Sequence, residues 1–506
     1  MTPPVIDAGR LEAAVPAWSA RRPLRLALLG DFGMEAPSSA ADAAARSARR
    51  PRRIDFDNFD EVIAQAERSL EVALPDGRIA ALRLGTLEDL HPDELSRQLP
   101  RGSATPEALR AVLMHPALRQ RESAWRGVDL LVRELGPGAS LEIHLFDLSA
   151  DELVADLAAL DSADDLTQTP LYHWLVRRPS EDADGGYAAI ACLHDHAATP
   201  DDLSRLARLA RIAAHAGAPL FTAMATDALA DRRHPPEKAV RAAFAALQAR
   251  PEAGFLCLAG PRFQLRHAYG RATDRIAAFD FEEFDPRLGL RSICWGHPAL
   301  VALLAWHRGG DLMLRDRPMQ VIRDADGEAV ALPCTDRLIR ADMAVTLRDY
   351  GVQALLAARN ESALRLIGLA AVDGTALSRN GPKPVWKAVD ESASSPIQIP
   401  TPTPAPAPVP PSWPEPMEAP RHDAAQDLAP TMAHDAVSTR SDDASSRAVD
   451  GGALEGNLMP RPAPLAQAQA ASVSAGTSAV GEDADTRAPA EDEVDAELAA
   501  LLKSLE

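Results

Sequence analysis

The sequence is poor in aromatic residues and in cysteine. Phe, Trp and Tyr together make up 4% of its 506 residues, and only four residues are cysteines. Cys192, Cys257, Cys294 and Cys334 are far apart and form no Cys-x-x-Cys pair, which argues against a zinc ribbon and against a disulfide framework. We expect four reduced, buried thiols.

Membrane and nucleic-acid signals are also missing. No apolar run reaches the roughly 18 residues of a membrane-spanning helix, and the first 23 residues lack the apolar centre of a signal peptide. The formal net charge is −20, and the sequence has no basic stripe of the kind that binds nucleic acid. These absences predict a cytoplasmic protein with no membrane insertion and no nucleic-acid partner.

Composition divides the chain in two. Residues 379–506 hold 18 of the 42 prolines and carry a charge of −11, and Trp413 is their only aromatic residue after Trp386. Such a segment buries too little apolar surface to offset its chain entropy, so we expect a disordered linker over 379–490 that is rich in Pro, Ala and Asp. The remaining part is long enough for one large core or two domains.

Hydrophobic patterns in this remaining part alternate between strand-like and helical. Buried strands are predicted at 24–29, 141–148, 187–195 and 219–225, and helices over 150–161 and 201–217, the second ending at Gly217, separate the later ones. A strand pair is expected within 254–266, a hairpin at 70–84, and a loop over 34–53. This order predicts an α/β (α+β) fold, with a mixed, mainly parallel sheet flanked by helices and a long disordered C-terminal tail.

The strand end at His194, Asp195 and His196 is the one candidate for catalysis. Histidines two positions apart on a strand share a face and can bind a metal, but the third ligand would have to come from Asp201 or Asp202. The alternative to a metal site is a pair of surface or turn histidines. This leaves open an α/β enzyme, metal-assisted and of unknown substrate, as the second hypothesis.

Other chemical motifs are lacking. The Gly30–Gly33 turn has neither a dinucleotide-binding nor a P-loop spacing, and the chain has no Gly-x-Ser-x-Gly elbow. Four tryptophans stand in apolar surroundings and are predicted to be core residues: Trp125, Trp174, Trp295 and Trp306. We therefore assign no catalytic, cofactor-binding or metal-binding residue, and expect no cofactor.

The last residues, 491–506, have helical periodicity. One face carries five apolar residues: Val494, Leu498, Leu501, Leu502 and Leu505. Sixteen residues are marginal as a free helix, so this pattern predicts a short amphipathic helix that binds a partner. A solubilising acidic tail is the alternative.

The order of several phrases resembles the contractile sheath subunits of type VI secretion. PLRLALLGDFG (23–33), RIDFDNFDEVIAQ (53–65) and LEDLHPDELSRQLP (87–100) are similar to the small (TssB-like) subunit. LMHPALRQRESAWRGVDLLVREL (113–135), GFLCLAGPRFQLRHAYG (254–270) and CWGHPALVALLAW (294–306) resemble the large (TssC-like) subunit. The resemblance implies a small-subunit-like region at 20–105 fused to a truncated large-subunit-like region at 106–378.

This resemblance implies a non-enzymatic structural or accessory sheath component that acts by protein–protein assembly. It would cap, nucleate or adapt the sheath, or serve as a protomer, with sheath or baseplate proteins or the sheath-disassembly ATPase as partners. Three departures are evident. Both subunit patterns lie on one chain, and the proline-rich segment stands where the large subunit would continue. His194 and His196 stand where the family has acidic and aromatic groups, which argues further against a metal site.

Overall fold

The computed structural model describes residues 6–11, 23–35, 42–65, 69–158, 165–181, 185–231, 233–323, 329–358 and 360–381. All of these residues belong to one compact unit. Nearly all of the predicted linker and the whole predicted C-terminal helix, 491–506, lie outside the described residues.

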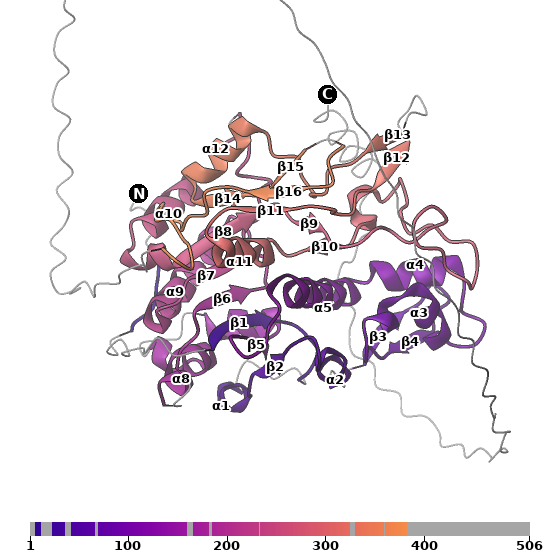
Figure 1. Ribbon diagram of the computed structural model, residues 1–506, viewed down its shortest axis with the longest axis horizontal. Helices are drawn as coiled ribbons and strands as arrows, with labels where there is room; N and C mark the ends of the chain where they lie inside the picture. The colour runs from indigo at the N-terminus through magenta and orange to yellow at the C-terminus, as the bar shows by residue number, and fades with distance from the viewer. Residues whose placement is uncertain are drawn as a thin grey trace, which may run out of the picture. The chain divides into compact units, whose positions relative to one another are not determined.

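A seven-stranded sheet forms the centre of this unit (Figure 1). Its strands, in spatial order, are β14 (Val352–Ala354), β8 (Leu256–Gly260), β7 (Leu220–Ala223), β6 (Ala189–Cys192), β1 (Leu24–Gly30), β5 (Leu141–Asp147) and β2 (Arg52–Ile54). All neighbouring pairs are parallel except β2 and β5. The predicted fold class, a mainly parallel mixed sheet, is confirmed.

Strand β1 is buried on both of its faces. Leu26 and Leu28 belong to one hydrophobic cluster, and Ala27 and Leu29 belong to another on the opposite face. Alternate residues of a strand point to opposite faces, so the uninterrupted apolar run is what a central strand requires.

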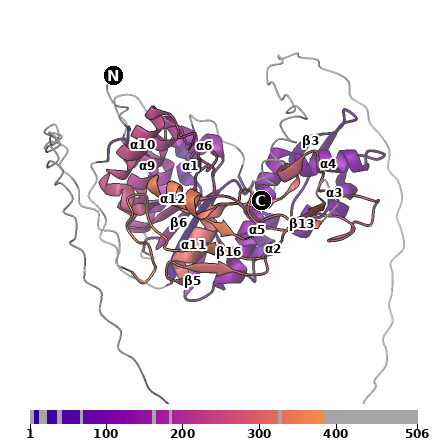
Figure 2. The same ribbon diagram turned by 90° about the horizontal axis from the view of Figure 1, so that it is seen from above.

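Helices cover both faces of the sheet, as Figure 2 shows with α9 and α10 on one side and α5 and α11 on the other. Apolar residues of the first layer form one cluster. This layer contains α6 (Ala150–Asp156), α7 (Pro170–Tyr172), the π-helical turn η3 (His173–Arg177), α8 (Arg178–Glu181), α9 (Pro200–Ala216), α10 (Lys238–Gln248) and α12 (Ala341–Asp349). The predicted end of α9 is confirmed, because Gly217 adopts the left-handed conformation with φ of 64°.

The opposite layer consists of α2 (Phe59–Ala64), α5 (Pro116–Leu135) and α11 (Pro298–Arg308). The nine residues from Pro298 to Trp306 are buried, which agrees with the lack of a polar face in this helix. The pattern at 106–135 is helical, and the chain forms two helices there, since Pro116 starts α5 after His115.

A third hydrophobic cluster surrounds the predicted hairpin, which is confirmed as β3 (Leu70–Ala73) and β4 (Ile79–Leu82). It also contains η1 (Glu88–Leu90), α3 (Pro92–Gln98) and α4 (Pro106–Met114). Ile276 and Phe281, from the long segment between β8 and α11, complete this cluster.

Small sheets and turns complete the unit. Both strands predicted within 254–266 are present, but they do not pair with each other, because β8 lies in the central sheet whereas β9 (Phe263–Gln264) pairs with β10 (Trp295–Gly296). A further small sheet has the strand order β11 (Leu312–Leu314), β16 (Leu364–Leu366) and β15 (Leu356–Ala357). Another consists of β12 (Val321–Arg323) paired with β13 (Ala329–Ala331). The remaining 3₁₀ turns are η2 (Leu166–Gln168), η4 (Pro251–Phe255) and η5 (Gly289–Ser292).

The loop expected over residues 34–53 is wrong in part. Its described residues include the helix α1 (Ala43–Ala48) and the edge strand β2. Arg46, on α1, is only 1% exposed and pairs with the buried Asp156 of α6 at 2.6 Å. A tertiary ion pair, which local composition does not reveal, therefore holds this helix in place.

Candidate functional site

A crevice opens at the carboxyl ends of β1 and β6, where the strand order changes direction. After β1, the chain adds β5 on one side and β6 on the other. Such a switch point is where open α/β sheets usually bind ligands. Two adjoining hollows, of about 380 and 530 Å³, share Pro116, Arg119, Asp195, Arg262 and Trp295. We call them together the strand-end crevice.

His194 and Asp195 of the predicted strand end line this crevice, but they are not arranged as metal ligands. The Nε2 of His194 donates to the Leu148 carbonyl oxygen at 3.0 Å, and the residue is 5% exposed. Burial, together with the neighbouring His196 and His297, lowers the pKa of His194 to about 4. The expectation of surface histidines is therefore wrong for His194.

His196 is also buried, and its Nδ1 lies 3.8 Å from a carboxylate oxygen of Asp202. Asp202 accepts hydrogen bonds from the Thr199 hydroxyl and the Ala197 amide at the start of α9, and it pairs with Arg205. Within the described ranges, no three His, Cys, Asp or Glu side chains are grouped to hold a metal ion. The metal-assisted enzyme hypothesis thus gains no support from this geometry.

His297 is a crevice residue that sequence reasoning missed. Its Nδ1 accepts a hydrogen bond from the Ala299 amide at the start of α11, so the proton of the neutral ring is on Nε2. Burial lowers the pKa of His297 and favours this neutral form. The Nε2 lies 3.7 Å from Asp195 and makes no hydrogen bond to a described residue.

Helix α5 supports the wall of the crevice. The Arg119 guanidinium donates to the carbonyl oxygens of Leu113 and Ile293 at 2.9 and 3.1 Å, and the Ser123 hydroxyl donates to the Trp295 carbonyl at 2.7 Å. Trp295 is only partly buried and lines both hollows, so its predicted place in the core is wrong. Trp125, Trp174 and Trp306 are core residues, as predicted.

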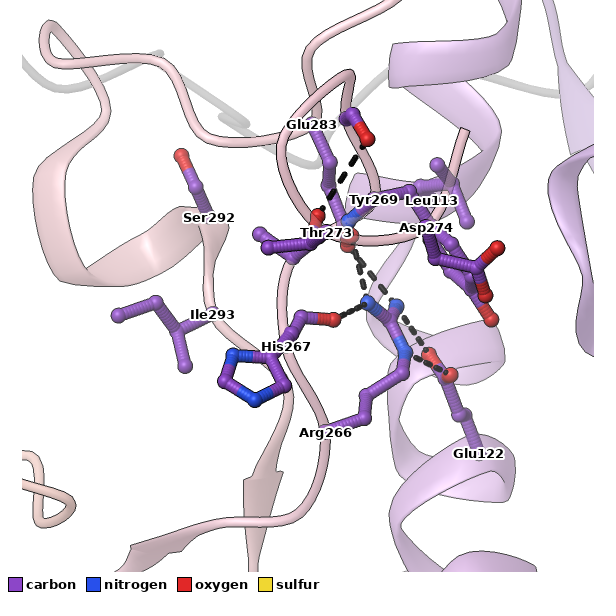
Figure 3. Close-up of polar contacts among 12 residues, drawn as sticks. Leu113, Glu122, Arg266, His267, Tyr269, Thr273, Asp274, Glu283, Ser292 and Ile293 are labelled. Carbon is purple, nitrogen blue, oxygen red and sulfur yellow. Dashed lines mark hydrogen bonds and ion pairs between the residues drawn. The ribbon is translucent and has the colours of Figure 1, made fainter. Parts of the chain in front are cut away.

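Next to this wall, Arg266 lies between two buried carboxylates (Figure 3). Its guanidinium contacts Glu122 of α5 at 2.6 Å and Glu283 at 2.5 Å, and it stacks over the Tyr269 ring at 4.0 Å. Arg126 binds the same Glu122 at 2.7 Å. Both glutamate side chains are 2% exposed, so the charges are almost fully removed from solvent.

The charges in this network stabilise one another. Burial alone would raise the pKa of Glu122, but Arg266 and Arg126 outweigh it and lower the pKa to about 2. Burial likewise opposes the charge of Arg266, but Glu122 and Glu283 raise its pKa well above the usual value. The network joins α5 to a segment 144 positions later and thereby fixes the crevice wall.

Sequence reasoning did not find this network, although one signal was present. Glu122 falls between Leu118 and Trp125 on the apolar stripe of α5, where a charged residue requires a buried partner. The identity of that partner depends on the tertiary fold.

The turn at Gly30–Gly33 is structural, as predicted. One carboxylate oxygen of Asp147 accepts hydrogen bonds from the Phe32 and Gly33 amides at 2.7 and 3.1 Å. The other accepts from the Glu35 amide at 2.6 Å. These amides, which in a phosphate-binding loop would face the ligand, are satisfied within the protein. Burial raises the pKa of Asp147 to about 6.

All four cysteines are free and buried, as expected. Burial raises the pKa of Cys192 and of Cys294 to about 12. No thiol is therefore activated as a nucleophile.

Comparison with known protein families shows which family this sequence belongs to. The sequence model of the VipB family, described as EvpB/VC_A0108, tail sheath N-terminal domain, matches residues 103–372. This range is more than half of the 506 residues. The chain belongs to this tail sheath family. The family consists of structural sheath proteins.

The chain is also similar to the type VI secretion system sheath protein TssC1 of Pseudomonas aeruginosa. The two are 25% identical over 203 residues, which are 37% of this chain and 40% of TssC1. The matched part thus spans less than half of this relative. The predicted likeness to the large sheath subunit is confirmed at the level of the family, whereas the likeness of residues 20–105 to the small subunit stays a prediction.

The tail sheath range contains β5 to β8 and all of the Arg266 network. It does not contain β1, which lies between β5 and β6 and comes from before residue 103. The edge strand β2 also comes from before residue 103, so two strands from outside the matched range complete the sheet of the sheath domain. Among the described helices, none is both long and apolar enough to cross a membrane.

Proposed function

We propose that this chain is a cytoplasmic, non-enzymatic component of a type VI secretion contractile sheath that acts by protein–protein assembly. The tail sheath match over residues 103–372 carries this proposal, and the likeness to TssC1 supports the type VI assignment. The polar groups described at the crevice wall hold α5 and the 266–295 segment together, which suits a load-bearing subunit.

Residues 20–105 take the place of the small sheath subunit in this proposal. The support is structural: β1 pairs with β5 over seven residues and with β6 over four, so this region is part of the central sheet. A small subunit that meets the large one in a shared sheet would gain a fixed ratio and register from fusion into one chain.

The chain acts as an accessory that caps, nucleates or adapts the sheath. The support is the change in composition after residue 378, where a proline-rich acidic segment replaces the large-subunit pattern. The apolar face of residues 491–506 binds a further component, which is a sheath protein, a baseplate protein or the sheath-disassembly ATPase. A long linker gives this helix the reach to do so.

The test is association with purified small and large sheath subunits, measured by co-sedimentation and by electron microscopy of the assemblies. The full chain is compared with a variant lacking residues 491–506 and with Leu498→Ala/Leu501→Ala/Leu505→Ala. We expect the full chain to bind sheath or baseplate components, and both variants to keep part of that binding through the folded region. Absence of any association for the full chain would overturn the proposal.

A further inference from the structure

A further hollow, of about 400 Å³, lies beside β14 at the edge of the central sheet. Small residues make up most of its described lining, and five of them are glycines: Gly309, Gly310, Gly351, Gly368 and Gly374. We call it the glycine hollow. Its charged lining residues are one acid, Asp311, and one base, Arg348, so their charges balance. The space left by the missing side chains therefore suits an apolar group rather than an ion.

Gln353, in the middle of β14, points into the glycine hollow. Its neighbours Val352 and Ala354 pack against the cluster on the α9 side of the sheet, so the Gln353 side chain is directed to the opposite face. Gln353 is 5% exposed, and its side-chain amide has no hydrogen-bond partner among the described residues. A buried amide without a partner is destabilising. The hollow thus suits a ligand that is mainly apolar but carries a hydrogen-bonding group.

A free main-chain edge borders the same hollow. Ala370 and Ala376 lie opposite each other in an isolated antiparallel bridge. The hydrogen bonds on either side of this bridge belong to Leu369, Ala371, Thr375 and Leu377. The amide and carbonyl of Ala376 therefore point away from the bridge, and they have no hydrogen-bond partner among the described residues. Ala376 is exposed, so this edge can accept a further strand.

The chain turns back directly after this bridge. The Gly381 amide donates to the Ser378 carbonyl oxygen at 3.2 Å, and the Asn380 amide donates to the Ser378 hydroxyl oxygen at 3.4 Å. These bonds close a β-turn over residues 378–381. Ser378 lines the glycine hollow, and Gly381 is the last described residue before the tail. The turn therefore directs the following residues back along the free edge of Ala376.

The sequence of these following residues, PKPVW (382–386), fits such an edge. Pro382 and Pro384 favour an extended backbone, and their missing donors are two positions apart, so both can face solvent on an edge strand. The donors of Lys383 and Val385 then face Ala376. Trp386 is five residues beyond Gly381, a stretch of about 17 Å when extended, so its ring is within reach of the hollow.

We propose that residues 382–386 of this chain add a strand to the Ala376 edge and that the Trp386 ring fills the glycine hollow. The indole combines a large apolar surface with one N–H donor, and this donor meets the free carbonyl oxygen of the Gln353 side chain. The proline-rich linker is then anchored to the folded unit at its start. This inference does not rest on the proposed sheath function.

Fluorine NMR of the full chain labelled with 5-fluorotryptophan tests the contact. The resonances of Trp386 and Trp413 are assigned by their loss in Trp386→Phe and Trp413→Phe, and a soluble gadolinium chelate is then added. We expect the chelate to broaden the Trp413 resonance and to leave the Trp386 resonance sharp. Trp413 is the matched control, because it is the other aromatic residue of the same proline-rich segment.

Two variants separate this site from any other place for the ring. Ala376→Phe fills the hollow from an exposed position, and Gln353→Met removes the amide with little change in volume. In both, the Trp386 resonance should lose its protection and broaden as Trp413 does, while circular dichroism spectra stay unchanged.

Three results would overturn the proposal. In the first, Trp386 is broadened as strongly as Trp413 in the wild type. In the second, Trp386 stays protected in both variants, which places its ring elsewhere. In the third, protection appears only as the protein concentration rises, which makes a second copy the occupant. Co-sedimentation with sheath subunits is measured separately, so the proposed function can stand or fall without this contact.

Discussion

The guanidinium of Arg46 lies 2.6 Å from a carboxylate oxygen of Asp156, and the two side chains are only 1% and 0% exposed. This pair joins the short helix α1 to α6 across 110 positions of the chain. Nothing in the six-residue helix itself would keep it folded, so the buried pair determines its position.

Arg46→Met should lower the free energy of unfolding by about 3–5 kcal/mol, because it leaves the Asp156 carboxylate buried without its partner. The double variant Arg46→Met/Asp156→Leu should recover most of this loss, since it removes both charges. Urea unfolding followed by circular dichroism measures both. As a control, Arg97→Met breaks an exposed pair with Glu94 and should change stability by less than about 1 kcal/mol.

Arg266→Lys should be nearly as damaging as Arg266→Ala. A lysine has no planar fork to bridge Glu122 and Glu283 at once, so one carboxylate loses its partner. We expect each variant to lose about 3–5 kcal/mol of unfolding free energy. Equal stability of Arg266→Lys and the wild type would show that charge alone, without the fork geometry, holds the segment.

Buried histidines should make the fold less stable as the pH falls below about 6.5. Burial lowers the pKa of His194 and of His215 to about 4 from the usual 6.5. The unfolded chain binds protons at these sites below pH 6.5 while the folded chain does not, so stability falls as the pH decreases from 7. At pH 5 each histidine contributes a loss of about 2 kcal/mol.

Asp147 and Asp156 have the opposite effect on how stability changes with pH. Burial raises the pKa of each to about 6, so between pH 6 and pH 4 the folded chain takes up these protons and is partly stabilised. Urea unfolding at pH 7.5, 6 and 5 should show a net fall, and His215→Leu should flatten it. A stability that is independent of pH over this range would contradict the assignment of neutral buried histidines.

Gly351→Ala should destabilise the protein by several kcal/mol. Gly351 has φ of 73°, and an added Cβ would lie 2.5 Å from the Val372 carbonyl oxygen. The matched control is Gly77→Ala, where φ is 80° but no atom lies within 4 Å of the new Cβ. Only the left-handed backbone is unfavourable there, at about 1–2 kcal/mol. Thermal unfolding of both variants separates the steric effect from the conformational one.

Much of the architecture could be predicted from local pattern. The apolar run that includes Leu26–Leu29 predicts a buried strand, and the helical pattern that stops before Gly217 predicts the end of α9; both predictions are confirmed. These signals depend on a few adjacent residues. They therefore determine the elements and fold class, but not the partners across the sheet.

The side chains that line and support the crevice could not be predicted in the same way. His194 and His297 are 103 positions apart, and Arg266 meets Glu122 only because α5 and the segment after β8 pack together. The partial exposure of Trp295 was missed for the same reason, because an apolar neighbourhood in sequence does not show which face stays open. Long-range packing decides these features.

The central place of β1 also governs the order of folding. Arg25 of β1 and Glu142 of β5, which pair with each other, are 117 positions apart. The other neighbour of β1, strand β6 (Ala189–Cys192), comes later still in the chain. During synthesis, β1 therefore emerges long before either neighbouring strand exists, and its apolar run stays exposed until about 190 residues have been made. A chain of this topology should depend on chaperones at the ribosome more than one whose early strands pair locally.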